Sequence, residues 1–413
     1  MTIPSSARRQ KYLGDKGLVA LITFLSAFVP LSTDLYLPAL PGMALYFGVS
    51  ADLANLTLIL FFVFFGAGTL FWGPLSDRYG RRPVLLAALS IYTAASLGCA
   101  LSGDIHQLIA FRIFQAVGAS GAFAVATAMV KDVYESKRRE PILAMVQSMV
   151  LISPVAAPVL GAILLRFVSW RGAFWALALI GLLALLGGLA LVETIGERSG
   201  GSLLGALGRI FRVAKNPGFS TLLLLFSLPG ISSMAFIAAS SYIYINGFGV
   251  SPQVYSYYFA ANAVGMISGP MIYMRVSRRL RRRSIIAASF GAIAGSGLLI
   301  SIFGERAPWL LAAALLPATI SASLVRTPAT NLMLEQQRGD TGSAAALMSF
   351  FGIFAGSLGM TVISLDWTDP IPVLGMMNLL VGLASGGLWL LIGNKSYVVA
   401  VPERYLPRGS ARR

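Results

Sequence analysis

The chain has 413 residues, of which 56% are apolar and only 12% carry a charge. About a quarter of the residues in a typical soluble domain are charged, so this composition excludes a soluble globular fold. The formal net charge of +16 would indicate a nucleic-acid partner in a soluble protein, so its placement along the chain needs an explanation.

Apolar runs of about 20 residues, separated by short polar breaks, follow one another along the chain. A helix of that length spans roughly 30 Å of hydrocarbon, whereas a barrel would show alternating strands of about ten residues. Because lipid cannot satisfy backbone polar groups, we predict twelve transmembrane helices. Their expected positions are 17–40, 53–75, 83–102, 106–131, 141–166, 171–193, 218–246, 251–275, 284–303, 308–333, 341–365 and 371–393.

Lysine and arginine residues concentrate in alternate loops. Of the 32, 27 fall in the two terminal segments and in the loops after the even-numbered spans. The positive-inside rule places these segments in the cytoplasm, so both termini are predicted to be cytoplasmic. The basic charge is therefore explained by topology, and no nucleic-acid partner is expected.

The longest break between spans divides them into two sets of six. The predicted organisation is a first bundle over 1–194, a cytoplasmic linker over 195–217, a second bundle over 218–395 and a cytoplasmic tail over 396–413. The linker contains a short amphipathic segment suited to the inner leaflet. This layout is typical of secondary transporters with the major facilitator fold, in which two related six-helix bundles enclose a central site.

The first span holds the only acid that lies well inside any span, Asp34, followed by Leu35-Tyr36-Leu37-Pro38. Ionisable residues are costly at that depth and are functional candidates by default. Burial disfavours the ionised carboxylate, so Asp34 is expected to bind and release a proton near neutral pH. The alternative is an acid near the outer end of the span that is merely hydrated.

The loop between the second and third spans, residues 73–82, reads Gly-Pro-Leu-Ser-Asp-Arg-Tyr-Gly-Arg-Arg. We expect Gly73 to let two helices pass closely and Gly80 to allow a tight turn. Asp77 is expected to face the positive start of span 11, near residues 341–342. A charge cluster is predicted at this end, in which Asp77 contacts Arg81 and Asp132 contacts Arg78 or Arg81. The alternative is that these residues only form a turn and set the topology.

Two arginines lie inside spans. Arg112, in span 4, cannot lose its charge and needs an anion or water nearby, and Asp34 or a substrate is its expected partner. Asp34 and Arg112 are thus the predicted proton-coupling residues. Arg326, in span 10, has no obvious acidic partner in the second half, and three possibilities stay open: it snorkels, it pairs with a bound anion, or it lies nearer the membrane surface.

Four features resemble the bicyclomycin- and chloramphenicol/florfenicol-resistance group of drug:proton antiporters, within the major facilitator superfamily. They are the segment 34–41, the loop 73–82, Arg112-x-x-Gln115-x-x-Gly118, and Ala157-Pro158-x-x-Gly161. The resemblance implies that Asp77 holds the halves together at a cytoplasmic gate, formed by Gly73, Asp77, Arg78, Gly80, Arg81 and Asp132. It further implies that an antiporter motif in span 5, with Pro154, Pro158 and Gly161, helps to seal the halves.

The predicted function is proton-coupled multidrug efflux by alternating access in a bacterial inner membrane. One membrane acid against two arginines argues against dicationic compounds and favours neutral, zwitterionic or anionic amphiphiles. Candidate substrate contacts are Asp34, Phe61, Phe65, Gln115, Met149, Phe236, Tyr242, Asn262 and Phe354. The expected partners are substrate, protons and membrane lipids, and the chain is expected to be monomeric.

No catalytic residue, metal site or cofactor is predicted, and the proton gradient is the expected energy source. The sequence contains no phosphate-binding loop of an ATP-driven pump and no cluster typical of an enzyme. The remaining alternative is a proton-coupled exporter or importer of a specific metabolite or organic anion on the same fold.

Overall fold

The computed structural model describes residues 10–134, 136–196, 203–337 and 340–395. The helices are α1 (Gly14–Ser26), α2 (Phe28–Asp34), α3 (Leu40–Phe47), α4 (Ala51–Tyr79), α5 (Arg81–Leu101), α6 (Ile105–Val133), α7 (Ser136–Leu164), α8 (Arg171–Leu189), α9 (Leu203–Ala214), α10 (Pro217–Ser241), α11 (Pro252–Val276), α12 (Arg282–Phe303), α13 (Pro308–Glu335), α14 (Thr341–Ile363) and α15 (Pro370–Ile392). No strand occurs in these described ranges. The predicted tail over 396–413 and several of the topology charges, such as Arg198 and Arg338, lie outside them.

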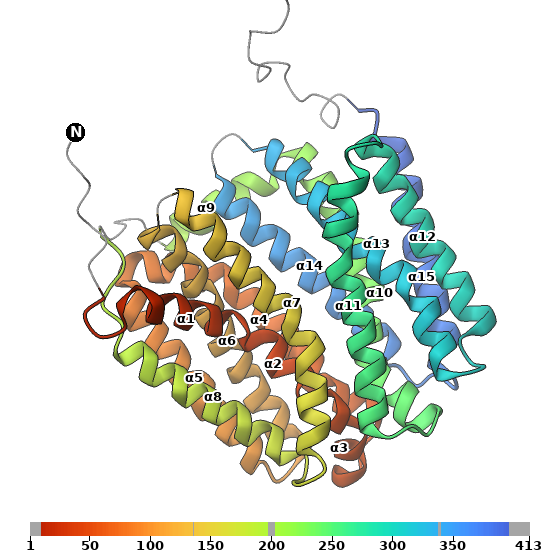
Figure 1. Ribbon diagram of the computed structural model, residues 1–413, viewed down its shortest axis with the longest axis horizontal. Coiled ribbons are helices and arrows are strands. Elements are labelled where there is room, and N and C mark those ends of the chain that lie inside the picture. Colours follow the sequence, from red (N-terminus) through yellow and green to blue (C-terminus); the bar gives the residue numbers. More distant parts are fainter. Residues whose placement is uncertain (1–9, 135, 197–202, 338–339, 396–413) are drawn as a thin grey trace, which may run out of the picture.

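Helices α1–α8 form one bundle and α10–α15 form a second, with α9 between them at one end (Figure 1). We call this end, which carries α9 and the turn between α4 and α5, the arginine-rich end. The opposite end carries α3 and the π-helical turn η2 (Tyr242–Gly247). The all-helical, two-bundle membrane fold predicted from the sequence is confirmed, whereas the side of the membrane that each end faces stays a prediction.

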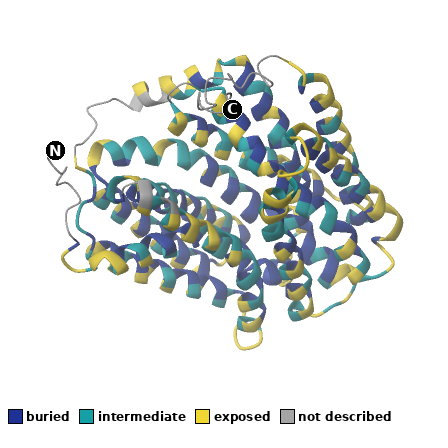
Figure 2. Ribbon diagram, turned by 45° about the horizontal axis from the view of Figure 1, so that its top comes forward, coloured by how far each residue is buried: buried dark blue, intermediate teal, exposed yellow. Residues whose placement is uncertain are grey.

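The outer faces of the bundles suit lipid. Buried residues concentrate where helices face one another, and exposed residues lie on the outer surfaces (Figure 2). On α8, for example, four leucines are about half exposed: Leu182, Leu183, Leu186 and Leu189. An exposed leucine stripe of this kind is stable in hydrocarbon but would be a liability in water.

Eleven segments of the described chain are long and apolar enough to span a membrane, against the twelve predicted. The missing one is α11, which is 25 residues long and therefore has the required length. It carries four tyrosines, two serines and Asn262, which lower its mean hydropathy. These polar groups mark α11 as a helix that faces protein rather than lipid over part of its surface.

The first span is broken rather than continuous. Helix α1 ends at Ser26, α2 ends at Asp34, and the 3-10 turn η1 (Leu37–Ala39) leads into α3. Three prolines, Pro30, Pro38 and Pro41, lack the N–H that an α-helix would need at these positions. The breaks therefore follow from the sequence, and they place Asp34 at the end of a helical segment.

The two bundles are joined at the opposite end. Asn55 of α4 donates a hydrogen bond to the Ser364 hydroxyl after α14 at 2.8 Å, and Gln253 of α11 donates to the Ala162 carbonyl of α7 at 2.9 Å. Helices α7 and α11 lie close together at that end and separate toward the arginine-rich end (Figure 1). The structure thus represents a conformation in which the bundles are closed at the opposite end.

Candidate functional site

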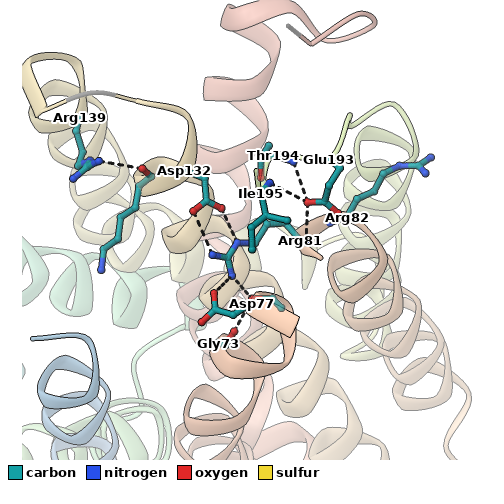
Figure 3. A network of polar contacts seen from close by, with 11 residues as sticks. Gly73, Asp77, Arg81, Arg82, Asp132, Arg139, Glu193, Thr194 and Ile195 are labelled. Atoms are coloured by element: carbon teal, nitrogen blue, oxygen red, sulfur yellow. Dashed lines mark hydrogen bonds and ion pairs between the residues drawn. The ribbon is translucent and has the colours of Figure 1, made fainter. Parts of the chain in front are cut away.

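A charge cluster at the arginine-rich end is centred on Arg81, the first residue of α5. Its guanidinium contacts the Asp77 carboxylate at 2.6 Å and the Asp132 carboxylate at 2.7 Å (Figure 3). Although it lies at the end of a bundle, Arg81 is only 5% exposed. The predicted contacts of Arg81 with both acids are present, and they tie the ends of α4, α5 and α6 together.

Other parts of the predicted gate differ from expectation. Arg78 is exposed and stacks on the Tyr79 ring at 5.4 Å, so Arg81 alone contacts Asp132. A Cβ atom added at Gly73 would meet nothing within 4 Å, so Gly73 does not serve a close helix approach here. Gly80 has a φ of 106°, a conformation that favours glycine, and the predicted tight turn is confirmed.

The expected contact between Asp77 and the start of α14 is absent from the described part of this conformation. The side chain of Asp77 is 45% exposed, and its partner there is Arg81. Helix α14 is instead capped by the preceding residue, Asp340, which accepts from the Ser343 N–H at 3.1 Å.

The sequence analysis missed Glu193, which follows α8. Its carboxylate accepts hydrogen bonds from four backbone N–H groups: those of Arg81 at 2.9 Å, Arg82 at 3.2 Å, Thr194 at 3.0 Å and Ile195 at 3.2 Å (Figure 3). An acid at the start of a helix satisfies free amides and complements the helix dipole. Glu193 therefore attaches the beginning of the linker to the turn that carries Arg81. The available signal was an acid at the last residue of the predicted sixth span, 171–193.

Asp34 lies at the end of α2 and is 5% exposed. Its carboxylate accepts a hydrogen bond from the Thr33 hydroxyl at 2.9 Å. The next residue lies against α7, because a Cβ atom added at Gly161 would fall 1.8 Å from the Leu35 carbonyl oxygen. Glycine is thus required at 161 for α7 to contact the chain beside Asp34. Pro154 and Pro158 lie within the same helix.

Arg112 does not contact Asp34, contrary to the prediction. It is 0% exposed, and its guanidinium donates to four oxygens, those of the Ser32 carbonyl, the Thr57 carbonyl, the Gln115 amide and the Tyr36 hydroxyl. It also lies over the Phe61 ring at 4.2 Å. The Ser32 carbonyl is free because α2 ends two residues later, which leaves the last carbonyls of α2 without helical donors. Arg112 therefore holds the break in the first span.

Three candidate substrate contacts are buried inside the first bundle. Phe61 and Phe65 belong to its core and are stacked with 6.4 Å between ring centroids. Gln115 is fully buried, where it accepts from Arg112 and donates to the Ser96 hydroxyl at 2.7 Å. These side chains are packed in this conformation and do not form a surface that a substrate could reach.

The other candidates lie nearer the space between the bundles. Phe354 of α14 is exposed and stacks on Phe350, and Met149 of α7 is half-buried. Phe236 stacks on Phe259 of α11. Two polar candidates have buried atoms without a hydrogen-bond partner, the Tyr242 hydroxyl and the Asn262 side-chain nitrogen. The described residues contain no group of His, Cys, Asp and Glu side chains placed to hold a metal ion.

Comparison with known proteins identifies the family. A family model described as the Major Facilitator Superfamily matches residues 22–361. The chloramphenicol resistance protein of Pseudomonas aeruginosa is 30% identical over 89% of this chain and 90% of its own length. The multidrug transporter MdfA of Edwardsiella ictaluri is 29% identical over 94% of this chain and 95% of its own.

Among solved structures, the peptide transporter POT in complex with sulfate superposes with a TM-score of 0.74 at 13% identity, covering 94% of this chain and 97% of that one. The family match spans most of the sequence, and the resemblance to drug-resistance transporters seen in its motifs is confirmed by these relatives. The chain therefore belongs to the major facilitator superfamily and is a membrane transporter.

Proposed function

We propose that this transporter exports neutral, zwitterionic or anionic amphiphiles across a bacterial inner membrane in exchange for protons. Relatives at about 30% identity that are named for drug resistance support export of such compounds. The observation that carries proton coupling is the environment of Asp34, a buried acid at a break in the first span with the Thr33 hydroxyl as its hydrogen-bond donor.

The proton step follows from that environment. An ionised carboxylate with one hydroxyl donor is poorly stabilised when water is excluded, so Asp34 favours its protonated form when enclosed. Release of the proton requires access to water, so the transport cycle would include a conformation in which Asp34 is less enclosed than it is here. Helix α7 contacts the backbone of Leu35, next to Asp34, through Gly161. A conformational change beside Asp34 could therefore be transmitted from the first span to α7.

The gate step uses the charge cluster. If the arginine-rich end is cytoplasmic, as the distribution of basic residues predicts, this conformation is open to the cytoplasm. Asp77 is half-exposed here and free to meet the start of α14 when that end closes. Asp77 would then stabilise the outward-open conformation, while Arg81 and Asp132 keep its helix in place.

Asp34→Asn removes the titrating group while preserving size and hydrogen bonding. In inverted vesicles from an efflux-deficient host, we expect uptake of chloramphenicol driven by a pH gradient to fall to background, with normal amounts of protein in the membrane. Asp52→Asn is the matched control, because Asp52 is an exposed acid in the first turn of α4. Uptake by the Asp34 variant that still responds to the gradient would refute the coupling role.

A second candidate function is transport of a specific metabolite or organic anion on the same fold. It is favoured by Arg326, whose guanidinium pairs with no carboxylate in the described residues. A panel of drug susceptibilities in the efflux-deficient host separates the two candidates, since a dedicated metabolite transporter would protect against none of the drugs.

A further inference from the structure

Arg326 lies inside a membrane-spanning helix without a protein counter-charge. It is nine residues before the end of α13, or about 13 Å from the arginine-rich end. The next two acids in the described chain are already engaged. Glu335 pairs with Arg282 at 3.1 Å, and Asp340 pairs with Arg209 at 4.0 Å while capping α14. The guanidinium itself makes no hydrogen bond or ion pair within the described ranges. The Arg326 side chain is exposed.

Other residues on the Arg326 face of α13 contact neighbouring elements. Arg326 follows Thr319 by seven residues, which is about two turns, and the Thr319 hydroxyl donates to the Asn262 side-chain oxygen of α11 at 2.7 Å. The same face is therefore covered by neighbouring elements toward the opposite end.

This face of α13 carries a polar stripe. Thr319, Ser323, Arg326 and Thr330 recur at the spacing of one helix face. Ser323 lies at the contact with α11, where a Cβ atom added at Gly269 would fall 2.8 Å from it. Arginine facing hydrocarbon would be very costly. From this cost we infer that the exposed Arg326 side chain faces water between the bundles.

A second donor lies beside this stripe, on α11. Asn262 is 6% exposed, its oxygen accepts from Thr319, and its side-chain nitrogen has no partner among the described residues. Side chains on a helix lean toward its N-terminus, and Thr319 lies about two turns before Arg326. The Arg326 guanidinium is thus a permanently charged donor without a partner in the described part of the chain, and it calls for an acceptor that carries negative charge.

We propose that Arg326 forms a subsite that binds the anionic group of the transported compound, a carboxylate in the simplest case. The inference rests on the proposed export function and adds to it a preference for amphiphiles that carry a negative charge over neutral ones. An arginine fork binds a carboxylate through two parallel hydrogen bonds, so it would select for charge and orientation.

The test compares two probes that differ only in charge, a dansyl-labelled fatty carboxylate and the primary amide of the same chain length. Their dissociation constants are measured by fluorescence with purified protein in phosphatidylcholine nanodiscs, which contain no competing anionic lipid. We expect the wild type to prefer the carboxylate. Arg326→Gln should weaken carboxylate binding by about tenfold or more and leave amide binding unchanged. The dissociation constant of Arg326→Lys for the carboxylate should lie between those of the wild type and Arg326→Gln, because lysine keeps the charge but loses the planar fork.

Arg306→Gln is the control, since Arg306 is an exposed loop arginine that stacks on Phe303. A wild type without preference for the carboxylate, or an Arg326→Gln variant that retains the preference, would overturn the inference. Equal losses for both probes would also overturn it, by indicating a structural role. The export function is tested separately: uptake of the neutral amide driven by a pH gradient should persist in Arg326→Gln and be lost in Asp34→Asn.

Discussion

At the scale of single residues, the buried charge of Arg112 is held by neutral oxygens rather than by a carboxylate. Its donors reach the free Ser32 carbonyl of the broken first span, the Thr57 carbonyl of α4 and the Gln115 side chain of its own helix. A buried guanidinium is stable only when its donors are satisfied in this way. Arg112 thus joins three segments at the break that precedes Asp34.

Arg112→Gln should therefore act on stability. The substitution leaves buried acceptors without a donor, so we expect a loss of about 2–4 kcal/mol in the free energy of unfolding, seen as a lower melting temperature in detergent. Arg306→Gln, in an exposed loop, should melt like the wild type. An Arg112 variant with unchanged melting but altered proton coupling would mean that the residue acts on Asp34 electrostatically after all.

The sequence predicted the depth of Asp34 and Arg112 well, because apolar flanking residues define where a span lies. It did not predict their partners. The acceptor for Arg112 is a backbone carbonyl that becomes free only because the prolines break the first span, and no side-chain pattern reports that. Likewise, Phe61 and Phe65 share the aromatic character of a binding site, but their helix face is turned into the core.

At the scale of elements, Glu193 connects the end of α8 to the start of α5. Its four acceptor contacts fix the turn in which Gly80 adopts its positive φ, and a Cβ atom at Gly80 would fall 2.4 Å from the Glu193 carboxylate. The linker to the second bundle begins directly after this residue. Glu193 is therefore placed to keep Arg81 oriented toward Asp77 and Asp132 while the bundles move.

Glu193→Gln should loosen this turn. A glutamine side chain has one acceptor oxygen where the carboxylate has two, so some of the four amides lose their partner. Hydrogen exchange measured by mass spectrometry should become faster in the peptide that contains residues 80–82. Glu335→Gln serves as control, because Glu335 pairs with Arg282 in the second bundle. Unchanged exchange at 80–82 would mean that Glu193 does not hold the turn.

At the scale of the whole molecule, the conformation is closed at the opposite end and separated at the arginine-rich end. Composition and charge placement predicted two bundles of six spans, because lipid imposes helices of a fixed length. The conformation could not be predicted, since the contacts that distinguish two states differ by only a few kcal/mol. The contact of Asp77 with α14 was predicted without reference to a state, and it is absent from this one.

Asp77→Asn should shift the population further toward the conformation seen here, because it removes the charge that would favour the start of α14 when the arginine-rich end closes. Spin labels at Lys131→Cys on α6 and Arg275→Cys on α11, in a Cys99→Ala background, should report longer distances across that end. Both labelled positions are exposed. Distance distributions that match those of the parent at acid and neutral pH would mean that Asp77 does not act on the conformational equilibrium and that its charge cluster only fixes the membrane topology.

The central claim is that binding of an exported compound is coupled to release of a proton from Asp34. The most direct measurement is proton release from purified protein in weakly buffered detergent, followed with a pH-sensitive dye when chloramphenicol is added. The account predicts that the wild type releases protons on addition, that Asp52→Asn does the same, and that Asp34→Asn releases none. Equal proton release from the Asp34→Asn variant and the wild type would contradict it.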